Sequence, residues 1–125
     1  MSKKAKAHEW QARDISDWNA TTYRAYLSER HEELYGIPYV TRNYAMEGRM
    51  LKTLYETHGK EATTAFIDAC LAEYKPSKQY PGINFAFMYS YMRRLLPQVL
   101  ADNKAEIKKI ERRKAVDYEK IAELL

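Results

Sequence analysis

The chain of 125 residues contains little cysteine, glycine or proline: one Cys, four Gly and four Pro. A single cysteine excludes a disulfide within the chain and a thiolate zinc site, which is typical of a reducing cytoplasm. Scarce glycine and proline leave long stretches free to be helical. No run of 18 apolar residues exists, so the sequence predicts no membrane span. The basic N-terminal residues lack a following apolar segment, so we expect no signal peptide.

What the chain does contain is enough apolar material for one folded domain and a modest excess of positive charge. Hydrophobic residues make up 46% of the sequence, which is sufficient for a buried core in a single domain. The net charge is +4 and the isoelectric point is about 9.1. This balance suits nucleic acid or an acidic protein surface, and it does not decide between the two.

Helical periodicity and stop signals predict an all-α fold. We expect a flexible basic arm over residues 1–15, a compact bundle of about four helices over 16–97 and a charged helix over 98–125. Pro97 should kink the fourth helix or start a new one. Capping residues and helix breakers set the boundaries: the helices begin at Asp17 or Asn19, near Thr41–Asn43, at Lys60 or Glu61 and after Asn84, and the first three end before Gly36, Gly59 and Pro76.

Each expected helix carries an apolar stripe at helical spacing. The short apolar link over residues 37–40 should pack against the core. The expected core positions are Tyr23, Tyr26, Leu27, Leu34 and either Arg30 or His31 in the first helix; Tyr44, Met46 or Glu47, Leu51, Leu54 and Tyr55 in the second; Ala62, Phe66, Ile67, Cys70 and Tyr74 in the third; and Phe85, Met88, Tyr89, Met92, Leu95, Leu96 and Val99 in the fourth.

Residues 74–101 contain no Asp or Glu, although carboxylates are spread through the rest of the chain. Cations beside planar rings are what a polyanion with stackable bases requires. The stretch itself contains both cations and aromatic residues. In one interpretation most of its aromatic residues belong to the core and its cations face solvent. In another, some of the tyrosines of the chain form a protein-binding face. The nucleic-acid hypothesis assigns phosphate binding to Lys75, Lys78, Arg93 and Arg94, and base stacking to Tyr80, Phe87 or Tyr91. The protein-binding face would draw on some of Tyr23, Tyr35, Tyr39, Tyr44 and Tyr80.

The C-terminal segment is dense in charge and carries a thin apolar seam. Its basic residues Lys108, Lys109, Arg112 and Arg113 are either secondary phosphate contacts or part of a salt-bridged, solvated helix. The seam consists of Ile107, Ile110, Ile121 and Leu124 and is interrupted by Lys114 and Asp117. A homodimer through residues 101–125 and a solvent-exposed extension are both compatible with this pattern.

The sequence offers no arrangement typical of a catalytic or metal site. The three histidines, His8, His31 and His58, are scattered, and no pair has the i,i+4 spacing of a metal-binding helix. No glycine-rich phosphate loop and no Ser or Cys nucleophile motif is present. Cys70 falls on the expected core face of the third helix and is interpreted as a small buried hydrophobe. We therefore expect no enzyme activity, cofactor or metal.

The stretch from Gly36 to Leu100 contains a helix–turn–helix unit centred on Gly59, then a loop, then an aromatic helix that begins at Asn84. This layout resembles the C-terminal helical domain of DnaD-like replication initiation proteins and phage replisome organisers. In such proteins the aromatic helix and the segment after it contribute to DNA and helicase contacts. The resemblance therefore implies binding roles for Tyr89, Tyr91, Arg93 and Arg94.

These observations predict a cytoplasmic, non-enzymatic nucleic-acid-binding accessory protein for DNA replication of a phage or mobile element. Its partners would be nucleic acid, expected to be DNA, and a replisome or host protein. The alternative is a protein-only adaptor or inhibitor that grips such a protein through a tyrosine-rich surface. A homodimer is compatible with either hypothesis.

Overall fold

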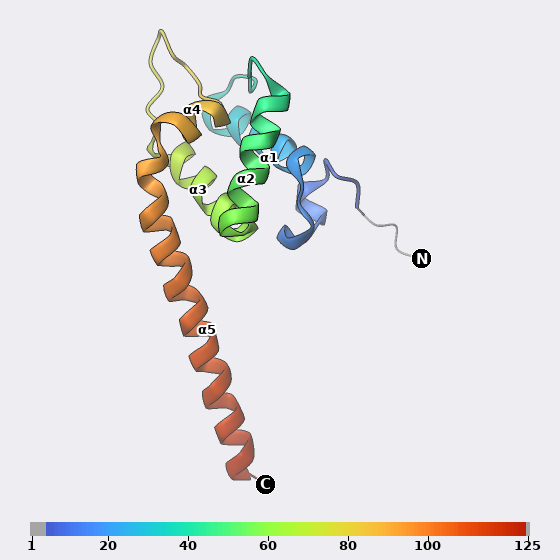
Figure 1. The fold of residues 1–125 in the computed structure, drawn as a ribbon, viewed down its shortest axis with the longest axis vertical. Coiled ribbons are helices and arrows are strands. Elements are labelled where there is room, and N and C mark those ends of the chain that lie inside the picture. The colour runs from blue at the N-terminus through green and yellow to red at the C-terminus, as the bar shows by residue number, and fades with distance from the viewer. Residues whose placement is uncertain (1–4, 125) are drawn as a thin grey trace.

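A computed structural model describes the backbone of residues 5–124 and the side-chain environment of residues 5–106 and 108–113. Regular structure in this part of the chain is entirely helical, which confirms the all-α prediction (Figure 1). The five α-helices are α1 (Ala20–Tyr35), α2 (Tyr44–His58), α3 (Lys60–Glu73), α4 (Phe85–Tyr91) and α5 (Leu96–Leu124), and short 3₁₀ turns lie at Trp10–Ala12, Ile15–Asp17 and Arg93–Leu95.

Three asparagines begin α1, α2 and α4, as expected from the sequence. The Asn19 Oδ1 accepts a hydrogen bond from the Thr22 amide at 3.1 Å, and the Thr22 hydroxyl accepts one from the Asn19 amide at 3.2 Å. The Asn43 side chain likewise accepts from the Met46 amide to cap α2, and the Asn84 side chain accepts from the Phe87 amide to cap α4, each at 2.9 Å. These side chains satisfy amide groups that have no partner within the helix.

Two glycines end α1 and α2, which confirms both predicted stops. Gly36 has φ of 73° and Gly59 has φ of 90°. Residues with a Cβ rarely adopt such angles, so glycine is the residue that permits these sharp exits. The Gly36 amide still donates to Glu32 at 2.8 Å, and the Gly59 amide donates to Tyr55 at 2.9 Å.

Helix α3 is the centre of the bundle. It contacts α1, α2, α4 and α5, and it contributes the fully buried side chains Phe66, Ile67 and Cys70. Phe85 and Met88 of α4 are also fully buried in the same core. Burial raises the pKa of the Cys70 thiol to about 12, which agrees with the interpretation of Cys70 as a core residue.

The buried faces of α1 and α2 differ from the expected stripes. Leu34 was expected in the core but exposes 48% of its surface, while His31, three residues earlier, is buried. Tyr44 and Met46 are exposed, and the charged Glu47 is buried instead. His31 and Glu47 were each named as one of two alternatives at their positions, and the structure selects them over Arg30 and Met46. Both are buried because they hold hydrogen bonds to neighbouring segments.

Part of the predicted N-terminal arm is packed on the bundle. The ring of Trp10 meets the edges of Trp18 and Tyr26, with centroids 6.0 and 4.8 Å apart, and its indole N–H donates to Glu29 at 2.7 Å. The predicted arm is therefore held from Trp10 onward. Its cations Lys3 and Lys4 lie outside the described residues.

The aromatic helix is shorter than its apolar pattern suggests. Helix α4 ends at Tyr91, and Met92 has φ of −117° and ψ of 9°, which breaks the helix before the 3₁₀ turn. Helix α5 then begins at Leu96, with Pro97 in its first turn, where a missing amide hydrogen costs nothing. Pro97 thus belongs to the start of a new helix. From there α5 continues well beyond the bundle (Figure 1).

Candidate functional site

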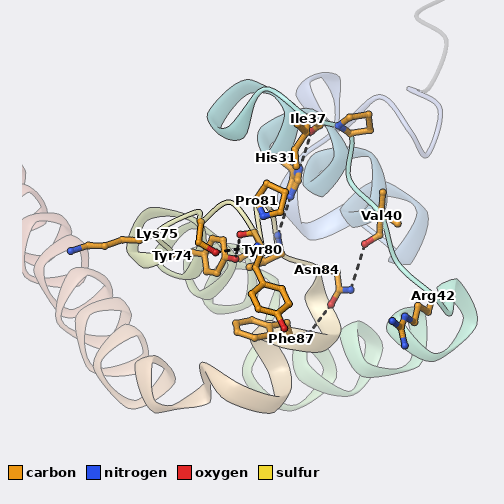
Figure 2. A pocket seen from close by; sticks show the side chains of 14 residues that line it. His31, Ile37, Val40, Arg42, Tyr74, Lys75, Tyr80, Pro81, Asn84 and Phe87 are labelled. Atoms are coloured by element: carbon orange, nitrogen blue, oxygen red, sulfur yellow. Dashed lines mark hydrogen bonds between the residues drawn. The ribbon is translucent and has the colours of Figure 1, made fainter.

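A cleft of about 760 Å³ opens between the link after α1 and the loop before α4. Its walls come from residues 37–42 of the link and from residues 74–84, and the first turn of α4 closes it with Phe87 (Figure 2). Most of the lining is apolar or aromatic, and the polar groups are few. Part of its lining belongs to residues 74–101, the acid-free window, which contains no Asp or Glu.

The buried side chain of His31 connects the two walls. Its Nδ1 lies 3.1 Å from the Ile37 carbonyl of the link, and its Nε2 lies 3.1 Å from the Ile83 amide of the loop (Figure 2). A carbonyl can only accept and an amide can only donate, so the ring is neutral with its proton on Nδ1. One side chain of α1 therefore fixes the positions of both walls.

Gly82 lets the loop approach this ring. A Cβ at Gly82 would lie 2.6 Å from His31 Cε1, closer still to Nε2, and 3.1 Å from Ile37 Cδ1. Such separations are shorter than van der Waals contact. The absence of a side chain at Gly82 is thus a requirement of close packing rather than of backbone angles, since its φ is not positive.

A second buried network joins the same segments from the other side. The Tyr39 hydroxyl accepts a hydrogen bond from the Phe85 amide at 2.8 Å and donates its own proton to Glu47. The Thr41 hydroxyl donates to the other oxygen of Glu47. Burial, together with the Glu47 charge, holds the pKa of Tyr39 above its ordinary value, so the hydroxyl keeps its proton.

The loop itself is held by its own hydrogen bonds. The Tyr74 hydroxyl donates to the Tyr80 carbonyl at 2.6 Å, and the amides of Ser77 and Tyr80 bond across the turn at 3.1 and 3.0 Å. At the far end of the loop, the side-chain nitrogen Nδ2 of Asn84 lies 3.5 Å from the carbonyl oxygen of Val40 (Figure 2). These bonds make the loop a fixed wall.

Three aromatic rings lie exposed in or beside the cleft. Tyr80 exposes 63% of its surface, Phe87 39% and Tyr91 72%. Phe87 and Tyr91 lie one helical turn apart on α4, with centroids 5.1 Å apart and planes tilted by 42°. A base cannot enter between rings at this distance, so both rings can offer only their outer faces to a planar ligand.

The charge lining the cleft is positive. Arg42 of the link and Lys75 of the loop lie on opposite sides of Tyr80 and Phe87 in Figure 2. The lining residues all belong to the described part of the chain, and none of them is Asp or Glu. A phosphate at the cleft would therefore meet flanking cations without a facing carboxylate.

The structure brings together only some of the predicted site residues. Lys75 and Tyr80 line the cleft, and Tyr91 adjoins it through Phe87. Lys78 is exposed on the same loop but does not line the cleft.

The two arginines of the predicted site already have partners within the chain. The guanidinium of Arg93 lies 4.5 Å from the centre of the Tyr89 ring. Arg94 forms an ion pair with Glu73 at 2.9 Å, so an acid from just outside the window neutralises it. Arg94 is thus less available to a ligand than the sequence suggested.

The second basic set does not contribute to the cleft. Lys108, Lys109, Arg112 and Arg113 are exposed on α5 beyond the bundle, and none of them lines the cleft. These residues therefore lie apart from the cleft.

Two features of the cleft were missed in the sequence. Arg42 was overlooked because it lies over thirty residues from the acid-free window and only the fold brings it near. Val40 was expected to pack with the link, but it exposes 70% of its surface at the cleft. The predicted tyrosine surface is also smaller than expected, because Tyr23 and Tyr39 are buried.

Within residues 5–124, no helix is both long and apolar enough to span a membrane. No three His, Cys, Asp or Glu side chains within residues 5–106 and 108–113 gather in a way that could hold a metal ion.

Comparisons of the chain with protein-family models, with curated proteins and with solved structures found no match. The interpretation of the cleft therefore depends on its own geometry and chemistry.

Proposed function

We propose that the cleft binds a single-stranded nucleic acid, stacking bases on Tyr80 and Phe87 and holding phosphates with Lys75 and Arg42. The observation that carries this proposal is the combination of exposed rings and flanking cations in a cleft lined by no carboxylate. Unpaired strands are bound by such surfaces, because their bases are free to stack and their backbones need positive charge. A duplex keeps its bases stacked on one another and would leave these rings unused.

The rigid walls support a binding role. Exposed aromatic side chains are useful for stacking only when their positions are fixed in advance, since ordering them at binding would cost conformational entropy. The hydrogen bonds of Tyr74 and Asn84 fix the loop and α4, and His31 fixes both walls. The cleft is thus built before any ligand arrives.

The broader role follows from the resemblance noted in the sequence. An accessory protein for DNA replication that binds a single strand without catalysing a reaction would need a cleft of this kind. The alternative, a protein-only adaptor, would use the same exposed rings together with Tyr44. That alternative has fewer surface tyrosines to draw on than the sequence suggested, and it predicts no affinity for oligonucleotides.

The test is fluorescence anisotropy with labelled single-stranded and double-stranded oligonucleotides at about 50 and 200 mM salt. We expect the single strand to bind more tightly than the duplex. Two phosphate contacts should lower the affinity about sevenfold between these salt concentrations, and four contacts about fiftyfold. Absence of binding to every oligonucleotide at the lower salt concentration would refute the proposal and favour the adaptor.

Side-chain deletions locate the site. Tyr80→Ala and Phe87→Ala should each lower the affinity about 5- to 150-fold through lost stacking. Tyr44→Ala is the matched control, because Tyr44 exposes 48% of its surface yet does not line the cleft. Lys75→Ala should flatten the salt dependence by about one phosphate contact, whereas Lys52→Ala, on the exposed surface of α2, should not. Equal effects of cleft and control variants would place any binding elsewhere.

A gain-of-function variant tests the ion pair beside the cleft. Glu73→Gln removes the carboxylate that lies 2.9 Å from Arg94. The released guanidinium should raise the affinity for single strands about two- to threefold and steepen the salt dependence. Unchanged binding would show that Arg94 takes no part in the site.

A further inference from the structure

The outer part of α5 has no covering partner within the described chain. Beyond Asn103, every described side chain as far as Arg113 is exposed, and Ile110 exposes 43% of its surface. Figure 1 shows the helix continuing away from the bundle. Most of the stability of a helix in a protein comes from the packing of an amphipathic face. A second surface would supply that packing for the outer part of α5.

The outer part of α5 carries a seam of residues at alternating spacings of three and four. These are the a and d positions of a heptad repeat, which lie along one side of a helix. Apolar residues occupy both ends of the seam, and one cation and one anion occupy its middle. In chain order the seam is Ile107, Ile110, Lys114, Asp117, Ile121 and Leu124.

The charges in the middle of the seam distinguish the two ways of pairing it with a second copy. In an antiparallel pair centred between Lys114 and Asp117, each lysine lies opposite the aspartate of the second copy. The same register places Ile110 opposite Ile121, and Ile107 opposite Leu124. In a parallel pair at equal register, Lys114 would face Lys114 and Asp117 would face Asp117, so like charges would meet at two successive layers.

We propose that α5 is a dimerisation helix that pairs with a second copy of this chain in antiparallel orientation. The occupant is identified by charge complementarity: the seam is complementary to itself in this orientation and repels itself in the other. Four apolar layers enclose two layers of opposite charges. Lys114 and Asp117, which interrupt the apolar seam, thereby determine that the two helices pair in antiparallel orientation.

The flanks of the seam predict how salt acts on this dimer. Arg113 and Lys120 occupy g positions, which face each other across an antiparallel pair. These two cations would repel each other at the edge of the dimer, where salt screens the repulsion. The two Lys114–Asp117 pairs would lie within the seam, where salt screens their attraction less. Moderate salt should therefore maintain or strengthen the dimer, in contrast to nucleic-acid binding, which salt weakens.

The test is sedimentation equilibrium of the full chain over about a hundredfold range of concentration. We expect a monomer–dimer equilibrium. Lys114→Asp places Asp against Asp in both central layers and should weaken dimerisation at least about tenfold. Adding Asp117→Lys to that variant restores opposite charges and should restore the dimer. Lys109→Asp is the matched control, since it makes the same charge change outside the seam.

Orientation is tested separately by cross-linking in a Cys70→Ala background. Chains with Ile107→Cys should form disulfides with chains carrying Leu124→Cys and not with each other. A monomer at all concentrations, equal effects of Lys114→Asp and Lys109→Asp, or cross-linking of Ile107→Cys chains to themselves would each overturn the proposal. Circular dichroism of every variant separates loss of the helix from loss of the dimer.

Discussion

Replacing Gly82 by alanine should destabilise the protein through one identified contact. The new methyl group would lie 2.6 Å from His31 Cε1 and 3.1 Å from Ile37 Cδ1. Relief requires either the ring or the loop to move, and either movement breaks one of the two 3.1 Å hydrogen bonds of His31. Overpacking of a core costs about 1–3 kcal/mol, and a buried polar group left without its partner costs about 1–3 kcal/mol. A movement that relieves the overpacking breaks a hydrogen bond instead, so the two costs do not add in full. We therefore expect the free energy of unfolding to fall by about 2–4 kcal/mol.

Urea denaturation followed by circular dichroism measures this loss as a shift of the midpoint at constant slope. A double-mutant cycle with His31→Ala then assigns the cause. Without the ring the methyl group meets only Ile37 Cδ1 at 3.1 Å, the far end of a flexible side chain, so Gly82→Ala in that background should cost less than about 1 kcal/mol. The coupling free energy between the two positions should consequently be large and favour the wild-type pair.

Gly48→Ala is the matched control for this experiment. A Cβ at Gly48 would lie 3.7 Å from the Ala20 Cβ, which is an ordinary contact, and Gly48 lies within α2. Alanine there should be neutral or stabilise the helix by up to about 1 kcal/mol. If Gly82→Ala were as stable as the wild type, or if its cost were unchanged by His31→Ala, the assignment of the clash to this ring would be refuted.

Two further predictions concern buried hydroxyl and thiol groups. Tyr39→Phe leaves the Phe85 amide without its acceptor and Glu47 without one donor, so unfolding by urea should require about 2–4 kcal/mol less free energy; an unchanged midpoint would contradict this network. Burial raises the pKa of Tyr23 and of Cys70 to about 12 each. Because the unfolded chain loses these protons first, stability should be full below about pH 9 and fall by several kcal/mol toward pH 12. Thermal unfolding across this range, with tyrosinate absorbance recorded in parallel, measures the effect; constant stability would contradict the burial.

Much of the fold could be predicted because the deciding residues act locally. Asn19, Asn43 and Asn84 cap the helices that follow them, and Gly36 and Gly59 adopt the backbone angles that end the helices before them. Capping and positive φ angles depend on a few neighbouring residues, so the helix ends can be predicted from short stretches of sequence.

The site was predicted only in part because its deciding contacts are between distant residues. The sequence left open whether Arg30 or His31 is buried, and His31 is the one because the Ile83 amide, far along the chain, supplies a partner for its ring. Arg42 joins the cleft through the fold, and Glu73 neutralises Arg94 through an ion pair that no local pattern indicates. The apolar stripe of the aromatic helix likewise continues across Met92, where the helix itself does not.

The amides of Ile83 and Phe85 provide a reporter for the cleft that requires no ligand. One lies at the end of a loop and the other in the first turn of a short helix, positions where amide hydrogens ordinarily exchange quickly with solvent. Each is bound instead by a buried side chain, His31 Nε2 for Ile83 and the Tyr39 hydroxyl for Phe85. Their exchange rates should therefore follow the opening of the cleft walls, and a ligand that binds between those walls should slow both amides together.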